Sequence, residues 1–264
     1  MNIVVCIKQV PATEARIKVN SEGNDIERDE LPYVVNPYDE FAVEEGLRIK
    51  ERIGDSSLTV VSIGTERVVS ALRTCLAMGA DKAVHVIDDG INCCDSYKTA
   101  LILSKVLKSI PYDIILFGKH AIDDDNGAVG IQTGELSGIG HISVVNKLEL
   151  DHENKKVTAN RQIEGGIEVI DANLPVIITC QKGMNEPRYP SLPGIMKAKQ
   201  KPLQKIGLEE LGLTPDVMEN NASKIRLINM SDPPKREAGR IIQGSHQDAV
   251  KELVNLLKGE SKVI

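Results

Sequence analysis

Residues 113–130 read DIILFGKHAIDDDNGAVG, and this stretch decides the fold. The apolar run Asp113–Phe117 ends at Gly118, which is typical of a strand that is buried on both faces. A loop then leads to the small residues of Gly127–Gly130, where the backbone can approach a ligand closely. A helix is expected to begin there, and its free N–H groups attract a phosphate. The stretch therefore predicts a strand, a ligand-binding loop and a helix of an α/β protein.

The same order of strand and helix recurs along the first 140 residues. Further buried strands are expected at Ile3–Ile7, Ser57–Ile63 and Ala83–Ile87. Amphipathic helices are expected at Glu40–Glu51, directly after Thr65 and at Ser96–Ser109. Asn36 and Thr65 are the expected N-caps of the first two helices. The repeated order implies a doubly wound, mostly parallel sheet with helices on both faces, which is a Rossmann-type α/β fold.

Sheets of this kind bind ligands where the carboxyl ends of the strands meet. The strand ends expected to meet are Cys6–Val10, Gly64–Thr65 and Gly118–Asp125. Asp123–Asp125 would repel a phosphate at this edge, unless the carboxylates face away or hold the loop through their own hydrogen bonds.

The pattern changes after about Gly140. Alternating polar and apolar residues predict antiparallel strands that extend the sheet, at His141–Leu150, Lys156–Ile163 and Ile167–Asp171, before the buried strand Val176–Cys180. The later segments of interest are Leu208–Leu211, a strand-like Lys224–Met230 and a helix at His246–Lys258. We expect one α/β domain over residues 1–205 and an extension over 206–264 that wraps a partner subunit.

A proline-rich stretch, QKGMNEPRYPSLPGIMKAKQK, occupies residues 181–201. Its three prolines are Pro187, Pro190 and Pro193. Neither a helix nor a central strand can run through such a stretch, so a stiff surface loop is expected. The loop would present the apolar Leu192 beside four lysines between residues 197 and 205. Docking of a partner protein fits this pattern, and an ordinary linker with a solvated run of charges fits it equally well.

Composition narrows the class of protein. The 264 residues are 41% hydrophobic and 27% charged, as in ordinary soluble globular proteins. A net charge of −6 and the scarcity of aromatic residues argue against nucleic acid as a partner. The chain opens on a strand-like run rather than a signal peptide, and its apolar runs are too short to span a membrane. The expected location is the cytoplasm.

The cysteines and histidines form no recognisable catalytic or metal-binding pattern. The five cysteines are scattered and odd in number, so most are expected to be small buried residues rather than disulfide partners. The adjacent Cys93 and Cys94 lack the spacing of redox and zinc motifs. The five histidines are too dispersed to ligate a metal. The dinucleotide fingerprint and the phosphate-loop motif are also missing from the sequence, which weakens NAD-dependent and ATPase interpretations.

Seven segments, in order along nearly the whole chain, resemble one family. They are MNIVVCIKQVP (1–11), NPYDEFAVEE (36–45), LAMGADKAVHV (76–86), LFGKHAIDDD (116–125), IDANLPVIITC (170–180), NEPRYPSLPGIMKAK (185–199) and DPPKREAG (232–239). The chain resembles the electron transfer flavoprotein β subunits. The resemblance implies an adenine-nucleotide α-hydrolase-like fold and a heterodimer with an α subunit. It further implies one FAD at the interface and a second nucleotide within the β subunit.

The resemblance also implies roles for particular residues. By position, the contacts to the second nucleotide would be Cys6, Asn36, Asp39, Ser62, Asp123, Gly127, Ala128, Val129 and Gly130. Within a recognition loop at 183–201, the docking contacts to acyl-CoA dehydrogenases would be Tyr189, Pro190, Ser191, Leu192, Pro193, Ile195 and Met196. A quinone oxidoreductase would accept the electrons. No catalytic residue or metal ligand is implied, because the chemistry belongs to the flavin.

The second nucleotide is open between AMP and FAD. AMP-binding members usually read Asn-Gln-Thr-Gly where this chain has Gly127–Gly130, so here the phosphate would depend on backbone N–H groups. Thr13 and Val129 resemble electron-bifurcating members, which bind a second FAD and oxidise NADH. Asp123–Asp125 and Asp232–Pro234 resemble the AMP-binding branch, and AMP is favoured. A third possibility, from another class, is a nucleotide-sensing module that binds ATP without redox chemistry.

Overall fold

The computed structural model describes residues 1–88, 95–220, 224–225, 227–234 and 238–264. Within them, nine strands form one sheet. In sheet order the strands are β11 (Leu203–Gly207), β5 (Lys82–Ile87), β4 (Ser57–Gly64), β1 (Asn2–Cys6), β6 (Ile114–Gly118), β10 (Val176–Cys180), β7 (Gly140–Asp151), β8 (Lys156–Ile163) and β9 (Gly166–Asn173). The strands from β11 to β7 are parallel, and β8 and β9 are antiparallel additions. The predicted α/β fold with a mostly parallel sheet is confirmed.

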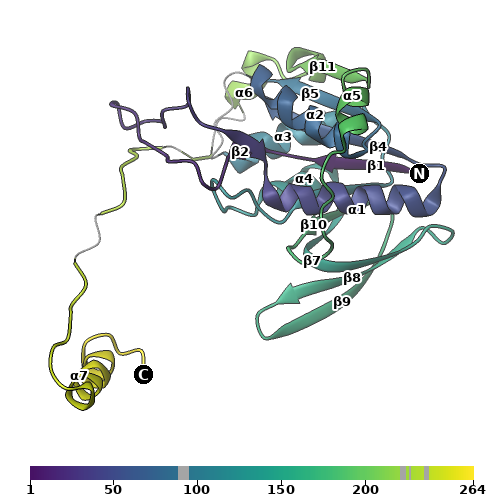
Figure 1. Ribbon diagram of the computed structural model, residues 1–264. Coiled ribbons are helices and arrows are strands. Elements are labelled where there is room, and N and C mark those ends of the chain that lie inside the picture. The colour runs from purple at the N-terminus through teal and green to yellow at the C-terminus, as the bar shows by residue number, and fades with distance from the viewer. Residues whose placement is uncertain (89–94, 221–223, 226, 235–237) are drawn as a thin grey trace.

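Helices cover both faces of this sheet, and α7 lies apart from it (Figure 1). The helices of the described residues are α1 (Pro37–Ile53), η1 (Glu66–Val68), α2 (Val69–Met78), α3 (Ser96–Leu107), α4 (Val129–Ser137), α5 (Leu192–Ala198), η2 (Glu209–Leu211), α6 (Pro215–Asn220) and α7 (His246–Gly259). One buried cluster joins the sheet to α1, α2 and α5, and a second joins it to α3 and α4. A small antiparallel pair, β2 (Gln9–Pro11) and β3 (Tyr33–Val35), lies beside the end of β1.

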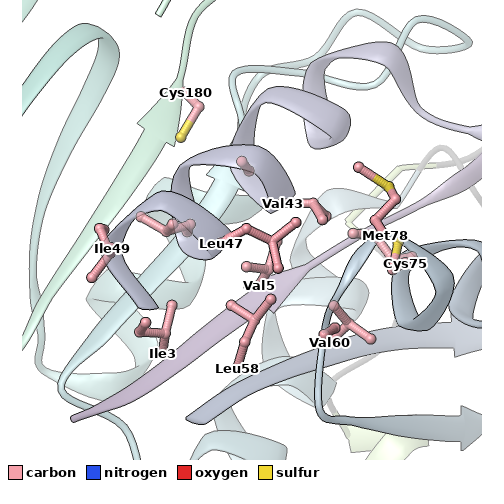
Figure 2. Packing of buried hydrophobic residues seen from close by; sticks show 14 of the residues in the cluster. Ile3, Val5, Val43, Leu47, Ile49, Leu58, Val60, Cys75, Met78 and Cys180 are labelled. Atoms are coloured by element: carbon pink, nitrogen blue, oxygen red, sulfur yellow. The ribbon is translucent and has the colours of Figure 1, made fainter. Parts of the chain in front are cut away.

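The central strand β1 divides its side chains between the two clusters. Ile3 and Val5 belong to the cluster under α1, whereas Val4 and Cys6 belong to the cluster under α3. This division follows from the two-residue period of a strand. Figure 2 shows the first cluster, in which α1 packs closely over β1 and β4. A side chain on Gly46 of α1 would lie 2.6 Å from Leu58 of β4, so a glycine permits this approach.

The strand β7 differs from the sequence prediction. The segment from His141 was expected to be wholly antiparallel, but its first half pairs in parallel with β10 and only its second half pairs antiparallel with β8. Both pairings contain a register shift close to Val145. Val144 has a positive φ of 59°, and its N–H donates to the Thr179 hydroxyl at 2.9 Å. The bulge therefore lets one long strand belong to both parts of the sheet.

The proline-rich stretch is only partly the irregular loop that was expected. It is irregular as far as Ser191, and then α5 begins at Leu192. The Ser191 hydroxyl caps this helix by accepting from the Gly194 N–H at 3.1 Å. Pro193 lies in the first turn, where the missing N–H of proline removes no helical hydrogen bond. The expectation of no helix is therefore wrong from Leu192 onward.

Two of the four lysines that were expected to form an exposed basic cluster make contacts within the protein instead. Lys201 donates through Nζ to the carbonyls of Leu76 and Ala80, at 2.9 and 2.6 Å. Lys205 forms an ion pair with Glu66 at 2.7 Å. These two lysines hold the chain against α2 and η1, so Lys197 and Lys199 remain as the exposed basic residues beside α5.

The C-terminal part of the chain begins within the sheet and ends in a helix that lies apart from it. The extension expected from residue 206 begins inside β11, and Leu213 is buried in the second cluster. Lys224–Met230 was expected to be strand-like, but its described residues, 224–225 and 227–230, form no strand. The predicted C-terminal helix is confirmed as α7, which lies apart from the sheet in Figure 1.

Cys6, Cys75 and Cys180 are buried free thiols, as predicted, whereas Cys93 and Cys94 lie outside the described residues. Among the described helices, none has both the length and the apolar character needed to cross a bilayer.

Candidate functional site

A pocket of about 450 Å³ lies at the carboxyl edge of the sheet. Its walls come from the ends of β1, β4 and β6, the three strand ends indicated by the sequence, and from the turn before α4. They include Cys6–Gln9, Ile63–Thr65, Phe117–Ala121 and Asn126–Gly130. Pockets for small ligands usually have volumes of about 300–1,000 Å³. The pocket is thus of a size for a compact ligand such as a mononucleotide.

Asp39 ties the first turn of α1 to two of these strand ends. One carboxylate oxygen accepts from the Lys8 N–H at 2.7 Å, and the other accepts from the Gly118 N–H at 3.0 Å. The side chain is only 6% exposed. Burial raises the pKa of Asp39 to about 7, although the two N–H donors favour the charged form. One buried carboxyl therefore fixes the spacing between the ends of β1 and β6.

Gly118 is a glycine because Asp39 and Tyr38 occupy the space beside it. A Cβ at this position would overlap the Asp39 carboxylate and would lie 2.6 Å from the Tyr38 carbonyl carbon. The loop after β6 is then held by Asn36, which is fully buried. Its side-chain amide donates to the His120 carbonyl at 2.8 Å and accepts from the Ile122 N–H at 3.2 Å. Asn36 occupies the N-cap position, but its side chain holds this loop and makes no cap hydrogen bond.

The three aspartates of the loop are held by protein groups. Lys8 forms ion pairs with Asp123 at 2.8 Å and with Asp124 at 3.1 Å. Burial alone would lower the pKa of Lys8, but the two carboxylates outweigh burial and raise it. The Asp125 carboxylate lies 2.8 Å from Nδ1 of His120. The expected repulsion of a phosphate is thereby reduced, because Lys8 balances charge next to the pocket.

The helix α4 presents its first turn to the pocket. Gly127 has a φ of +61°, and Gly127–Gly130 all line the wall. Ala128 stands at the N-cap position, and an alanine has no side chain that can accept from the first-turn N–H groups. A Cβ on Gly130 would lie 2.9 Å from Thr179, so a glycine lets α4 start directly against the sheet. The N–H groups at this end are available to an anion.

Comparison with known proteins shows the family of this chain. The family model described as "Electron transfer flavoprotein domain" matches residues 24–211. A Bacillus subtilis (strain 168) protein, "Electron transfer flavoprotein subunit beta", is 42% identical over 265 residues, which cover 100% of both chains. The chain belongs to the electron transfer flavoprotein β-subunit family. The resemblance found in the sequence is confirmed.

Two further relatives show the breadth of this family. The mitochondrial electron transfer flavoprotein subunit beta of Arabidopsis thaliana is 35% identical and is also covered over 100% of both chains. The "Caffeyl-CoA reductase-Etf complex subunit CarD" of Acetobacterium woodii is 35% identical over 98% of each chain. The relatives of this chain are thus named for different assemblies.

The structure separates the residues carried over from the family into two groups. Six line the pocket, namely Cys6, Asp39, Gly127, Ala128, Val129 and Gly130. The other three stand behind the wall: Asn36 holds the loop, Asp123 pairs with Lys8, and the Ser62 hydroxyl donates to the Ile7 carbonyl at 3.0 Å. Burial raises the pKa of the Cys6 thiol, so this residue contributes to the wall as a neutral group.

Several pocket residues were not named individually from the sequence, although Lys8, Lys119 and His120 fall within strand ends that it indicated. They include Lys8, Arg28, Tyr33, Arg67, Lys119 and His120. Arg67 lies 4.5 Å above the ring of Tyr33, and Arg28 makes a bidentate contact with Asp25 at 2.7 and 2.9 Å. In the sequence, Lys8, Arg67 and Lys119 each follow a predicted strand end within three residues, and this pattern could have identified them. Lys8 and Arg28 are paired with carboxylates, so Arg67 and Lys119 are the members of this set that can favour an anionic ligand.

The residues expected to dock a partner lie on a different face, and we call positions 189–196 the docking segment. Tyr189, Leu192 and Met196 are 93%, 79% and 74% exposed, and Ile195 is 47% exposed. Such large apolar side chains gathered in one short segment are typical of a protein-binding surface.

Replacing Gly118 with alanine tests the contact with Asp39. We expect Gly118→Ala to lower the free energy of unfolding by about 1–3 kcal/mol, because the new methyl group must displace Asp39 or the backbone of Tyr38. The matched control is Gly140→Ala, where a Cβ meets no atom within 4 Å. Chemical denaturation of both purified variants measures the difference, and equal stabilities would contradict the contact.

The pKa of Asp39 predicts a pH dependence. The folded pKa of about 7 lies above the unfolded value of 3.8, so the folded state holds this proton more tightly. The contribution of Asp39 to stability is therefore fully present below pH ~4 and is lost as the pH rises to ~7. We expect the stability of the protein relative to Asp39→Asn to fall across this window. Denaturation at several pH values measures it, and a constant or rising difference would refute the raised pKa.

Proposed function

We propose that this chain is the β subunit of a heterodimeric electron transfer flavoprotein and acts as an electron carrier rather than a stand-alone enzyme. An FAD at the interface with an α subunit would carry electrons from acyl-CoA dehydrogenases, or similar donors, to a quinone oxidoreductase in the cytoplasm. The observation that carries this proposal is the 42% identity to an electron transfer flavoprotein subunit beta over the whole of both chains. The protein supplies binding and orientation, and the flavin supplies the redox chemistry.

The pocket is proposed to hold AMP as a structural nucleotide. Its phosphate would accept from the N–H groups of Gly127–Gly130, and its adenosine would lie against the strand ends at Cys6 and Gly64–Thr65. The volume of about 450 Å³ and the basic residues Arg67 and Lys119 in the lining support a compact anion. A ligand that binds only the folded state stabilises the protein by mass action.

A second FAD is the alternative occupant of this pocket. It is favoured by Val129 and Thr13, and by the relative that belongs to a caffeyl-CoA reductase–Etf complex. In that case the protein would be part of an electron-bifurcating enzyme, and the second FAD would accept hydride from NADH.

The extension over residues 206–264 is proposed to pack on the α subunit. Its helix α7 has an apolar stripe at helical spacing, formed by Val250, Leu253 and Val254, which are 59%, 46% and 36% exposed. A helix that exposes an apolar stripe needs a partner surface to bury it. The proposed partner is the subunit that shares the FAD.

The nucleotides released from the purified complex test the cofactor proposal. We expect acid release followed by chromatography to give FAD and AMP in a ratio near one to one, because each subunit interface and each β pocket holds one nucleotide. Two FAD and no AMP would establish the bifurcating alternative. A colourless, stable monomer that binds ATP would instead indicate the nucleotide-sensing module.

Truncating Leu192, which is 79% exposed, tests the docking role. We expect Leu192→Ala to raise the KM for an acyl-CoA dehydrogenase by about tenfold, since exposed anchors of an interface contribute on the order of 1–2 kcal/mol or more. The FAD content should stay normal. The control is Ile167→Ala on β9, which removes a 57% exposed side chain outside the docking segment. An unchanged KM for Leu192→Ala would exclude this role.

A further inference from the structure

The docking segment is anchored at its start by Arg188, the residue directly before it. The Arg188 guanidinium donates to both carboxylate oxygens of Glu44, through Nε at 2.8 Å and Nη2 at 3.0 Å. The backbone N–H of Arg188 also donates to Glu44, at 3.1 Å. The Glu44 side chain is only 4% exposed, so these bonds are largely shielded from water. Charge-assisted, bidentate bonds of this kind are among the strongest in proteins.

Arg188 reaches a second carboxylate on the same helix. Its Nη2 donates to Glu51 at 3.1 Å, and its Nη1 donates to the other oxygen of Glu51. Glu44 and Glu51 are seven residues apart on α1, which places them on one face of the helix two turns apart. One guanidinium therefore bridges two turns of α1. The Arg188 ion pair holds the pKa of the Glu51 carboxyl below its ordinary value.

Asn185 adds a second anchor to the same helix. Its side-chain amide donates to the Phe41 carbonyl at 3.0 Å and to the Glu45 carboxylate at 3.1 Å. Asn185 is 8% exposed and Glu45 is also 8% exposed. Asn185 thus fixes the chain to α1 three residues before Arg188.

The far end of the docking segment is held by α2. A Cβ on Gly194 would overlap the Ala77 carbonyl, so this glycine lets α5 lie directly against the end of α2. Arg73 of α2 donates to the carbonyls of Ala198 and Lys201, at 2.5 and 2.9 Å. The segment is therefore fixed on both sides, while Tyr189 and Leu192 remain exposed.

We propose that Arg188 is the positioning residue of the docking segment, which α1 and α2 hold in its binding conformation before a partner arrives. This inference rests on the proposed docking function and explains why the docking segment is held in one conformation. A loop that is ordered in advance loses less conformational freedom when it binds. A lysine would not replace Arg188, because a single ammonium cannot make the bidentate contact with Glu44 and reach Glu51 together.

The test uses variants of Arg188 in the complex with the α subunit. Arg188→Gln alone would leave the buried Glu44 carboxylate with Arg48 as its remaining charged partner, through a single contact of 3.2 Å, and would destabilise the fold. The informative variant is therefore Glu44→Gln/Arg188→Gln, which removes both charges. We expect its KM for the dehydrogenase to rise about tenfold with unchanged kcat and normal FAD content. Arg188→Lys should raise KM as well, whereas the control Arg52→Lys, on the exposed last turn of α1, should leave it unchanged.

A second readout separates positioning from general structural damage. Hydrogen exchange should become faster at the N–H groups of Gly194 and Ile195, both of which donate to Ser191, with no change in the core strands. An unchanged KM in the double variant, or an Arg188→Lys variant that docks normally, would overturn the role of Arg188. If Leu192→Ala also leaves KM unchanged, the docking function itself is wrong. If only Leu192→Ala raises KM, the docking function stands and the positioning role falls.

Discussion

The buried carboxylate of Asp39 is the interaction on which the pocket depends. It accepts from two backbone N–H groups, at Lys8 and Gly118, which belong to neighbouring strand ends and lie 110 positions apart in the sequence. Backbone hydrogen bonds hold the strands along their length, but these bonds end where the strands end. Asp39 continues the connection beyond β1 and β6, and Gly118 leaves the space that this connection needs. The walls of the pocket thus have a fixed spacing without a ligand.

Helix α1 serves both the nucleotide pocket and the docking segment. Its first turn supplies Asp39, and its later turns supply Glu44 and Glu51, which hold Arg188. Gly46, which lies between Glu44 and Glu51, lets the same helix approach β4 closely. Figure 2 shows α1 packed over β1 and β4. A helix that is packed along its length on a rigid sheet can position both the nucleotide pocket and the docking segment relative to that sheet. The proposed AMP and the proposed dehydrogenase contact thus rest on one element of secondary structure.

The sequence predicted the features that depend on local pattern. The buried strands β1, β6 and β10 are continuous apolar runs, and the turn at Gly127–Gly130 is marked by its small residues. The edge strand β11 was missed because among its five residues only Ile206 is buried, which leaves no apolar run. The role of Asn36 was also missed, since its partners lie 84 and 86 residues away. The balance of Asp123 and Asp124 by Lys8 likewise joins residues that only the folded chain brings together.

A crystal structure of the purified complex with its α subunit tests most directly whether this pocket holds the second nucleotide. The expected density is a single phosphate within hydrogen-bond distance of the N–H groups of residues 127–130, with Asp39 still accepting from Lys8 and Gly118. The adenosine should extend toward Cys6 and Gly64. A pocket without nucleotide, or a nucleotide whose phosphate lies away from the start of α4, would contradict the proposed site.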